Sequence, residues 1–373
     1  MSRSPLELPD FPWDALAPAG ARARAHPDGV IDLSVGSPVD PTPAVIRAAL
    51  AAATDAHAYP QTMGTPELRE AIVAWYARRR GVDDLSVANV LPTIGSKELI
   101  SLLALFLGIG KGDVVVQPLL AYPTYALGAA LVGATVVSSD DPAQWPEGTK
   151  LIWVNSPGNP DGRVLSIDQL KAAVARAREL GAVIASDECY AELNWVGDGA
   201  GDYQATPSIL DPRVIAGERN SVLAVYSLSK QSNLAGYRAA FVAGSIDLID
   251  ELVAVRKHVG LIPPAPVQAA MIAALGDDAH VAAQRELYRA RRAVLSPALE
   301  AAGYRIDESG AGLYLWATNG RDAWVSVEEF ASLGILVAPG SFYGDGAAEH
   351  VRIALTATDA AIAGAAERIR ATS

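Results

Sequence analysis

The chain has 373 residues, half of them hydrophobic, and a formal net charge of −12, which argues against nucleic acid or an anionic membrane as a general partner. The single cysteine, Cys189, excludes an internal disulfide and fits a reducing compartment, and the five scattered histidines offer no metal-ligand spacing. No apolar run has the length of a signal-peptide core or a membrane span, so we expect a soluble cytoplasmic protein without a metal.

Short apolar runs rich in branched residues alternate with helical patterns through the middle of the chain. The runs that predict strands are residues 114–118, 135–139, 151–157, 182–188, 222–227 and 239–245. The clearest helix follows Ser166, which has capping-box spacing with Gln169, and it ends at Gly181. Such alternation predicts an α/β fold with a mostly parallel sheet between layers of helices.

The pattern changes after about residue 265. A long arginine-rich helical stretch runs from about 279 to 302, and short strands then alternate with helices. We therefore expect a large domain over residues 46–264 and a smaller α+β domain built from residues 1–45 and 265–373. The stretch LIPPAP at 261–266 is the expected boundary.

Polar residues follow several of the predicted strands, at the edge where ligands bind in parallel sheets. These residues are Asn155, Asn159, Asp187, Tyr190, Gly95, Ser96 and Lys97. Each one taken singly also has a purely structural interpretation. The Asn-Pro-Asp-Gly stretch is a β-turn, Asp187 could cap a helix, and Gly95-Ser96 could be an ordinary helix start.

Lys230 is harder to explain as a structural residue. Among the lysines of the chain, it alone directly follows a strand of apolar residues, VLAVYS. Burial of an ammonium group is costly, so such a lysine tends to lose its proton. A neutral lysine amine is a nucleophile toward carbonyl groups, which predicts covalent chemistry at this position.

Pyridoxal 5′-phosphate (PLP) is the one chemistry that uses all of these groups. Lys230 would form an aldimine with the cofactor, and Asp187 would pair with the pyridine nitrogen and keep it protonated. Asn159 and Tyr190 would hydrogen-bond the ring hydroxyl. The groups expected to hold the phosphate are Ser227, Ser229, Arg238 and the backbone amides of Gly95 and Ser96.

In combination, these motifs resemble those of the fold-type I, class I and II aminotransferases. The matching stretches are LSVGSPVDP, YPQTMGTPELREAI, NSPGNPDG, SDECY, SLSKQSNLAGYR, GILVAPGSFYG and HVRIAL. The resemblance covers nearly the full length and implies a PLP-dependent transaminase with Lys230, Asp187 and Tyr190 as catalytic residues. Asp161 departs from the family, which usually carries threonine at that turn position.

The resemblance implies further roles that the residues alone do not reveal. Tyr122 would stack on the pyridine ring, although a core tyrosine is also a reasonable interpretation. Tyr59 would reach the phosphate of the neighbouring subunit, which implies a homodimer. Arg352 would bind the substrate α-carboxylate through a bidentate pair, with Gly36 and Asn159 as further substrate contacts.

Within the family, the sequence resembles in particular the actinobacterial succinyldiaminopimelate aminotransferases. Stretches such as LPDFPWDALAP, AYPTYALGAALVGA and VRKHVGLIPPAPVQAAM carry this resemblance. The implied reaction is a ping-pong exchange between N-succinyl-L,L-2,6-diaminopimelate and 2-oxoglutarate in lysine and diaminopimelate biosynthesis. Both substrates carry distal carboxylates, and Lys97 is the candidate cation for them. A solvated lysine at a helix start is an equally good interpretation of Lys97.

Two alternatives stay open at this point. The chain could be an aminotransferase of other specificity (L,L-diaminopimelate, aspartate, alanine or aromatic substrates) or a PLP-dependent lyase on the same fold. A transcriptional regulator with an aminotransferase-like domain is disfavoured, because LSVGSPVDP begins near residue 33 and leaves little room for a DNA-binding domain before it.

Overall fold

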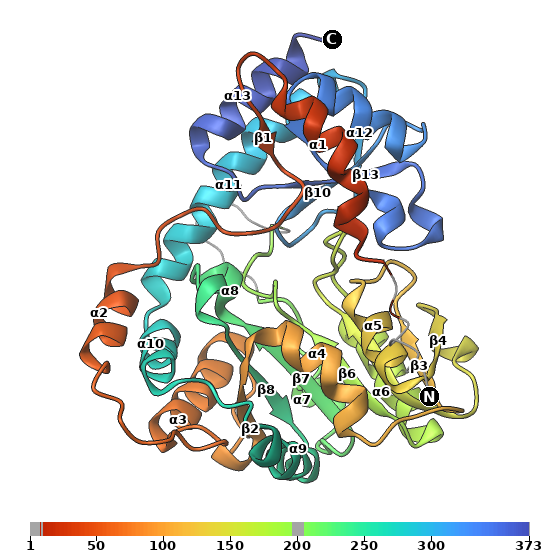
Figure 1. The fold of residues 1–373 in the computed structure, drawn as a ribbon. Coiled ribbons are helices and arrows are strands. Elements are labelled where there is room, and N and C mark those ends of the chain that lie inside the picture. The colour runs from red at the N-terminus through yellow and green to blue at the C-terminus, as the bar shows by residue number, and fades with distance from the viewer. Residues whose placement is uncertain (1–7, 9, 196–204, 373) are drawn as a thin grey trace, which may run out of the picture.

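The computed structural model describes residues 8, 10–195 and 205–372, which form a larger and a smaller lobe (Figure 1). A seven-stranded sheet lies at the centre of the larger lobe, in the order β2-β8-β7-β6-β5-β3-β4. Its strands are β2 (Val90–Ile94), β3 (Val114–Gln117), β4 (Thr135–Ser138), β5 (Thr149–Asn155), β6 (Val183–Asp187), β7 (Val222–Ser227) and β8 (Ala239–Gly244). Only β8 runs antiparallel to its neighbours, so the predicted α/β fold with a mostly parallel sheet is confirmed.

Helices cover both faces of this sheet, and each face has its own apolar core. They are α3 (Pro66–Trp75), α4 (Gly95–Phe106), α5 (Thr124–Val132), α6 (Ile167–Leu180), α7 (Pro212–Ile215), α8 (Leu228–Gln231) and α9 (Ile246–Val259). Successive residues of β7 alternate between the cores: Val222 and Ala224 belong to one, Leu223 and Val225 to the other. This two-sided burial explains the uninterrupted apolar run in the sequence.

Local signals in the sequence set the ends of α6. The Ser166 hydroxyl accepts a hydrogen bond from the Gln169 backbone N–H at 3.2 Å, and the Gln169 side chain accepts one from the Ser166 N–H at 2.9 Å. Gly181 ends the helix in the left-handed region, with φ of +63°. The predicted capping box and glycine stop are thus confirmed.

The smaller lobe contains a four-stranded antiparallel sheet in the order β12-β13-β10-β9, and a parallel pair of β1 with β11. Its strands are β1 (Ile31–Asp32), β9 (Arg305–Asp307), β10 (Tyr314–Thr318), β11 (Ile335–Leu336), β12 (Ala338–Pro339) and β13 (His350–Ala354). Its helices are α1 (Ala17–Arg24), α11 (Asp278–Ala301), α12 (Ala323–Ser332) and α13 (Asp359–Arg370). Segments from both ends of the chain share one core here.

Helix α10 (Ala265–Gly276) packs on α2 (Ala44–Ala52) and on α3, beside the large sheet. Its residues Met271 and Leu275 belong to the core of the larger lobe. We therefore propose a domain boundary after α10, at the start of α11, in place of the expected boundary at residue 264. No helix in the described part of the chain is long and apolar enough to cross a membrane.

Candidate active site

Lys230 lies in α8, the short helix that follows β7 at the carboxyl edge of the large sheet. Ser227 caps this helix, because its hydroxyl accepts a hydrogen bond from the Ser229 N–H at 3.2 Å and donates one to the Ser229 hydroxyl at 2.9 Å. The Lys230 Nζ donates to the carbonyl of Gly36, which comes from the N-terminal segment. Two predicted phosphate ligands and the predicted attachment lysine thus occupy one turn.

The environment of Lys230 shifts the side-chain amine toward its neutral form. Burial is the main cause of its lowered pKa, and the positive charge of Arg352 acts in the same direction. The phenol of Tyr314 opposes both effects. The net direction is downward, so the amine is more readily available as a nucleophile or base than an ordinary lysine.

Asp187 ends β6 with its side chain buried. Its carboxylate accepts hydrogen bonds from the Tyr125 hydroxyl at 2.9 Å and from the Cys189 backbone N–H at 3.1 Å. Burial raises the Asp187 pKa, and these hydrogen bonds oppose that rise. A positive ring nitrogen would favour the ionised form of such a carboxylate.

Tyr125 was not predicted as a site residue, although it fixes the orientation of Asp187. Its ring stacks on Trp153 with centroids 5.0 Å apart and an interplanar angle of 17°. Tyr122 meets Tyr125 edge-on at 5.8 Å, and its own ring is only partly buried. The sequence signal that could have identified Tyr125 is its three-residue spacing from Tyr122 in AYPTY, because this spacing places both rings on one side of a helical turn.

Arg352 on β13 is 2% exposed. Its Nη1 donates to the Asn159 side-chain oxygen at 2.9 Å, and its Nη2 donates to the Ser34 carbonyl at 2.6 Å. The guanidinium carbon lies 3.9 Å from the centroid of the Tyr314 ring. The Arg352 Nε is buried without a partner among the described residues, so this cation retains capacity for a ligand carboxylate.

Tyr314, on β10, lies with the predicted residues, although it was not predicted as a site residue. Its hydroxyl lies 3.2 Å from that of Tyr190. A Cβ on Gly36 would lie 2.1 Å from the same hydroxyl, so only glycine fits there. Burial would raise the Tyr314 pKa, but the charges of Arg352 and Lys230 outweigh it and lower the pKa.

The start of α4 has the form of a phosphate cradle. Gly95 has φ of +72°, and an added Cβ would lie 2.3 Å from Nη2 of Arg238. Arg238 is itself exposed, in the left-handed region, and its Nη1 donates to the Ala235 carbonyl at 2.9 Å. The helix-start amides, the guanidinium and the hydroxyls of Ser227 and Ser229 form a donor set that fits a phosphate dianion.

Two predicted residues lie apart from these groups in the single chain. Tyr59 is 99% exposed and points away from the chain that carries it. Lys97 is exposed at the first turn of α4, where its Nζ lies 5.6 Å from the centroid of the Phe11 ring. Asp161, which stands where the family usually has threonine, affects only its own turn. Its carboxylate accepts a hydrogen bond from the Arg163 N–H at 3.2 Å.

Comparison with known proteins agrees with this geometry. The model of the family "Aminotransferase class I and II" matches residues 28–369. A probable aminotransferase of Mycobacterium tuberculosis is 54% identical over 97% of this chain and 85% of its own length. The 4-dedimethylamino-4-oxo-anhydrotetracycline transaminase OxyQ of Streptomyces rimosus is 54% identical over 97% of this chain and 99% of its own length. A solved structure, the probable N-succinyldiaminopimelate aminotransferase of Thermus thermophilus, has a TM-score of 0.85 at 27% identity, covering 97% of this chain and 100% of that one.

Proposed function

Because the chain belongs to the class I and II aminotransferases, which are PLP-dependent transaminases, we propose that its substrates are N-succinyl-L,L-2,6-diaminopimelate and 2-oxoglutarate. This pair would place the enzyme in lysine and diaminopimelate biosynthesis. The name of the Thermus thermophilus structure supports the proposal. The stronger support comes from the positions of two cations.

Arg352 and Lys97 lie against neighbouring rings of one aromatic cluster. The Arg352 guanidinium is 5.8 Å from the Trp13 ring, and the Lys97 ammonium is 5.6 Å from the Phe11 ring. The two rings are 5.7 Å apart. A substrate with carboxylates at opposite ends would place one at each cation, along the rings of Trp13 and Phe11. This chain of contacts is the observation that carries the proposed specificity.

We propose the following roles around the cofactor. PLP, when bound, supplies a protonated pyridine ring that withdraws electrons from the substrate α-carbon. Lys230 would attach the cofactor and then use its neutral Nζ to take the α-proton of the substrate. Asp187 would hold the proton on the ring nitrogen, while Tyr190 and Asn159 would orient the ring hydroxyl. Arg352 would fix the α-carboxylate and so aim the α-hydrogen at Nζ.

We also propose a homodimer. Tyr59 is a large aromatic side chain that is almost fully exposed, in a segment that precedes α3. In a dimer, the Tyr59 side chain of one subunit would reach the phosphate cradle of the other subunit. Arg238, part of that cradle, is also exposed in the single chain. Loss of cofactor affinity in Tyr59→Ala, together with a dimer in sedimentation, is the expected outcome.

A second candidate specificity is a polycyclic aromatic ketone, as in the name of OxyQ. The observation that favours it is the same aromatic cluster, in which the Trp13 and Phe342 rings lie 5.4 Å apart. Phe11 is 55% exposed and could contact a flat ligand. Such a substrate would pack against the aromatic rings and would not need the charge of Lys97.

The test is a set of half-reactions followed by the absorbance of the bound cofactor. The donors are N-succinyl-L,L-diaminopimelate, L,L-diaminopimelate, glutamate, aspartate and alanine, and the acceptors are 2-oxoglutarate and an anhydrotetracycline ketone. We expect the succinylated donor to convert the cofactor at the lowest concentration, and Lys97→Ala to weaken that preference. Conversion by another donor, or preference for the ketone, would overturn the proposed substrates. Lys230→Ala should abolish turnover with every pair, and turnover in that variant would overturn the proposed mechanism.

A further inference from the structure

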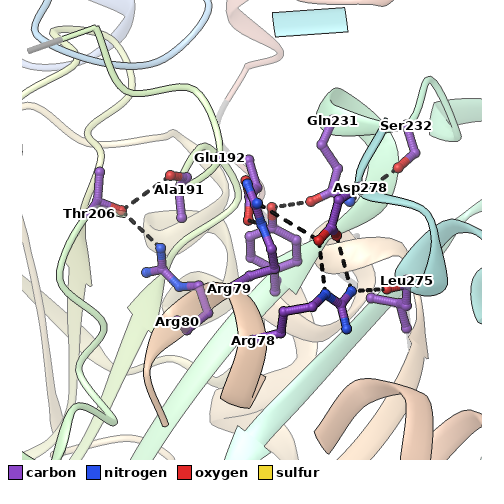
Figure 2. Close-up of polar contacts among 11 residues, drawn as sticks. Arg78, Arg79, Arg80, Ala191, Glu192, Thr206, Gln231, Ser232, Leu275 and Asp278 are labelled. Carbon is purple, nitrogen blue, oxygen red and sulfur yellow. Dashed lines mark hydrogen bonds and ion pairs between the residues drawn. The ribbon is translucent and has the colours of Figure 1, made fainter. Parts of the chain in front are cut away.

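The chain that follows α3 forms a π-helical turn, Tyr76–Arg80, which ends at Gly81 with φ of +65°. Single π-turns are rare within helices and often occur at functional sites. Three consecutive arginines, Arg78, Arg79 and Arg80, project from this turn. Figure 2 shows that Arg78 and Arg79 share Asp278, whereas Arg80 reaches Thr206. Arg79 and Arg80 also form ion pairs with Glu192 and Glu188. Two of those partners belong to the segment that carries Asp187 and Tyr190.

Arg80 forms an ion pair with Glu188 in the interior. The Arg80 side chain is 0% exposed and that of Glu188 is 1% exposed, and Nη2 lies 3.0 Å from Oε2. The other oxygen of Glu188 accepts from the Ile209 N–H at 2.7 Å and the Ser208 hydroxyl at 3.1 Å. Arg80 Nη1 donates to the Thr206 hydroxyl at 3.1 Å. Both oxygens of this carboxylate are therefore held in place.

Arg79 forms a two-pronged contact with Glu192. Its Nε donates to Oε1 at 3.1 Å, and its Nη2 donates to Oε2. The Glu192 side chain is 1% exposed. Two parallel hydrogen bonds fix the carboxylate in direction as well as in position.

These two glutamates lie on either side of Tyr190 in the sequence, and Glu188 directly follows Asp187. The backbone between them is a succession of turns, with Ala191 N–H bonded to the Glu188 carbonyl at 3.0 Å and Leu193 N–H bonded to the Tyr190 carbonyl at 2.9 Å. No helix or strand of the described chain contains residues 188 to 193. The arginine contacts thus fix both carboxylates of a short irregular segment, whose apolar side chains pack in the cores.

We propose that Arg79 and Arg80 are positioning residues that hold the segment 187–192, and through it the Asp187 carboxylate and the Tyr190 hydroxyl, against the cofactor ring. A stability role alone explains the contacts poorly, because buried ion pairs are often no better than apolar residues of similar volume. Such buried ion pairs do, however, fix the positions of the carboxylates and of the backbone that carries them. The inference rests on the roles proposed above for Asp187 and Tyr190, and it is independent of the substrate.

Arg78 offers a matched control in the same turn. It binds Asp278 and the Leu275 carbonyl and makes no hydrogen bond to the segment 187–192, and its side chain is 41% exposed. Asp278 also lies 3.9 Å from Arg79 Nη1, so Arg78→Gln keeps that contact of Arg79 while it removes the charge of Arg78. The experiment compares Arg79→Gln, Glu192→Gln and Arg78→Gln in the holoenzyme. It measures the dissociation constant for PLP and the pH midpoint of the absorbance change of the bound cofactor, and it records the melting temperature of each cofactor-free variant.

We expect Arg79→Gln and Glu192→Gln to raise the dissociation constant for PLP by roughly tenfold or more, as second-sphere losses do elsewhere. We also expect both to shift the pH midpoint, because the Tyr190 hydroxyl would no longer be held at the ring hydroxyl. Arg78→Gln should leave both readouts near their wild-type values. Should Arg79→Gln fail to fold, Glu192→Gln keeps a similar shape and supplies the same comparison.

The inference is overturned if Arg79→Gln and Glu192→Gln match Arg78→Gln in both cofactor readouts. The variant Asp187→Ala distinguishes a failure of the positioning inference from a failure of the cofactor-binding role proposed for Asp187. Weakened PLP binding in Asp187→Ala, combined with unchanged binding in the Arg79 and Glu192 variants, would overturn the positioning role alone. Unchanged PLP binding together with full activity in Asp187→Ala would overturn the role of Asp187 and the inference that depends on it.

Discussion

Two buried arginines, Arg80 and Arg352, compensate the cost of burying a guanidinium charge in opposite ways. Arg80 is 4% exposed and faces the carboxylate of Glu188, whereas Arg352 is 2% exposed and faces neutral oxygens of Asn159 and Ser34. No acidic side chain of the described chain is within ion-pair range of Arg352. Burial of a guanidinium therefore does not by itself indicate a ligand site. The charge of Arg80 is already paired with a carboxylate of the protein, whereas the neutral partners of Arg352 leave its charge available to a ligand.

Neutral acceptors orient a cation without cancelling its charge. The rings of Tyr314 and Tyr343, with centroids 3.9 and 4.9 Å from the Arg352 guanidinium, add an attraction that also leaves the charge in place. A ligand carboxylate would complete this site as Glu188 completes that of Arg80. The following predictions test this contrast, beginning with the largest expected effect.

Arg352→Leu should lower kcat/KM by roughly 10²- to 10⁴-fold, because the substrate carboxylate would lose its charged partner. The stability of the cofactor-free protein should change little, since no buried carboxylate is left unpaired. Steady-state kinetics and urea unfolding measure the two effects. A loss of unfolding free energy as large as that expected for Arg80→Leu would show that the fold already satisfies the Arg352 charge, and would break the contrast.

Arg80→Leu should cost about 3–5 kcal/mol of unfolding free energy, because it leaves the Glu188 charge buried without its partner. Urea unfolding of the cofactor-free protein measures this loss. The double variant Arg80→Leu/Glu188→Leu should recover most of it, since both charges are then absent. If the double variant is no more stable than the single one, packing and not charge accounts for the loss.

The pKa of Lys230 should rise in Arg352→Leu. The Lys230 pKa is lowered mainly by burial and in part by the charge of Arg352, so removal of that charge makes the protonated amine less unfavourable. Labelling of Lys230 by an amine reagent in cofactor-free protein, followed against pH, should show a midpoint below the ordinary pKa of a lysine side chain. In Arg352→Leu this midpoint should move upward. An unchanged midpoint would remove Arg352 from the electrostatics of the lysine.

Arg78→Gln should have the smallest effect, about 1 kcal/mol or less, because its ion pair with Asp278 is partly exposed and screened by solvent. Urea unfolding at two salt concentrations measures it. A loss as large as that of Arg80→Leu would mean that the whole turn, and not burial of the pair, determines stability.

Much of the fold was predictable because its signals are local. The apolar runs of β5, β6 and β7 and the capping box at Ser166 are short patterns, and each formed as expected. The position of α10 was not predictable in this way. Its apolar residues suit either lobe, and only contacts with α2 and α3, more than 180 residues away in sequence, determine where it packs.

Some residues of the site were likewise predictable from the sequence, and others were not. Lys230 was selected because a lysine directly after an apolar strand has few structural explanations, and Asp187 was selected because it joins Lys230 in one cofactor chemistry. Arg352 was identified only through the family resemblance. Tyr125 and Tyr314 were missed because each acts through a side chain distant in sequence, 62 residues away for Asp187 and 124 for Tyr190. Tyrosines are common in cores, so their residue type carries little information without the contact.

The central position of β7 has a consequence for the lifetime of the site. Its side chains are shared by two apolar cores, and both of its edges are paired, with β6 and β8. Local opening of this strand would disrupt both layers at once, so its amides should exchange with solvent only through global unfolding. Lys230, the proposed attachment lysine, therefore follows a strand that we expect to exchange most slowly. A covalently held cofactor would stay anchored while the lobes and loops around it fluctuate.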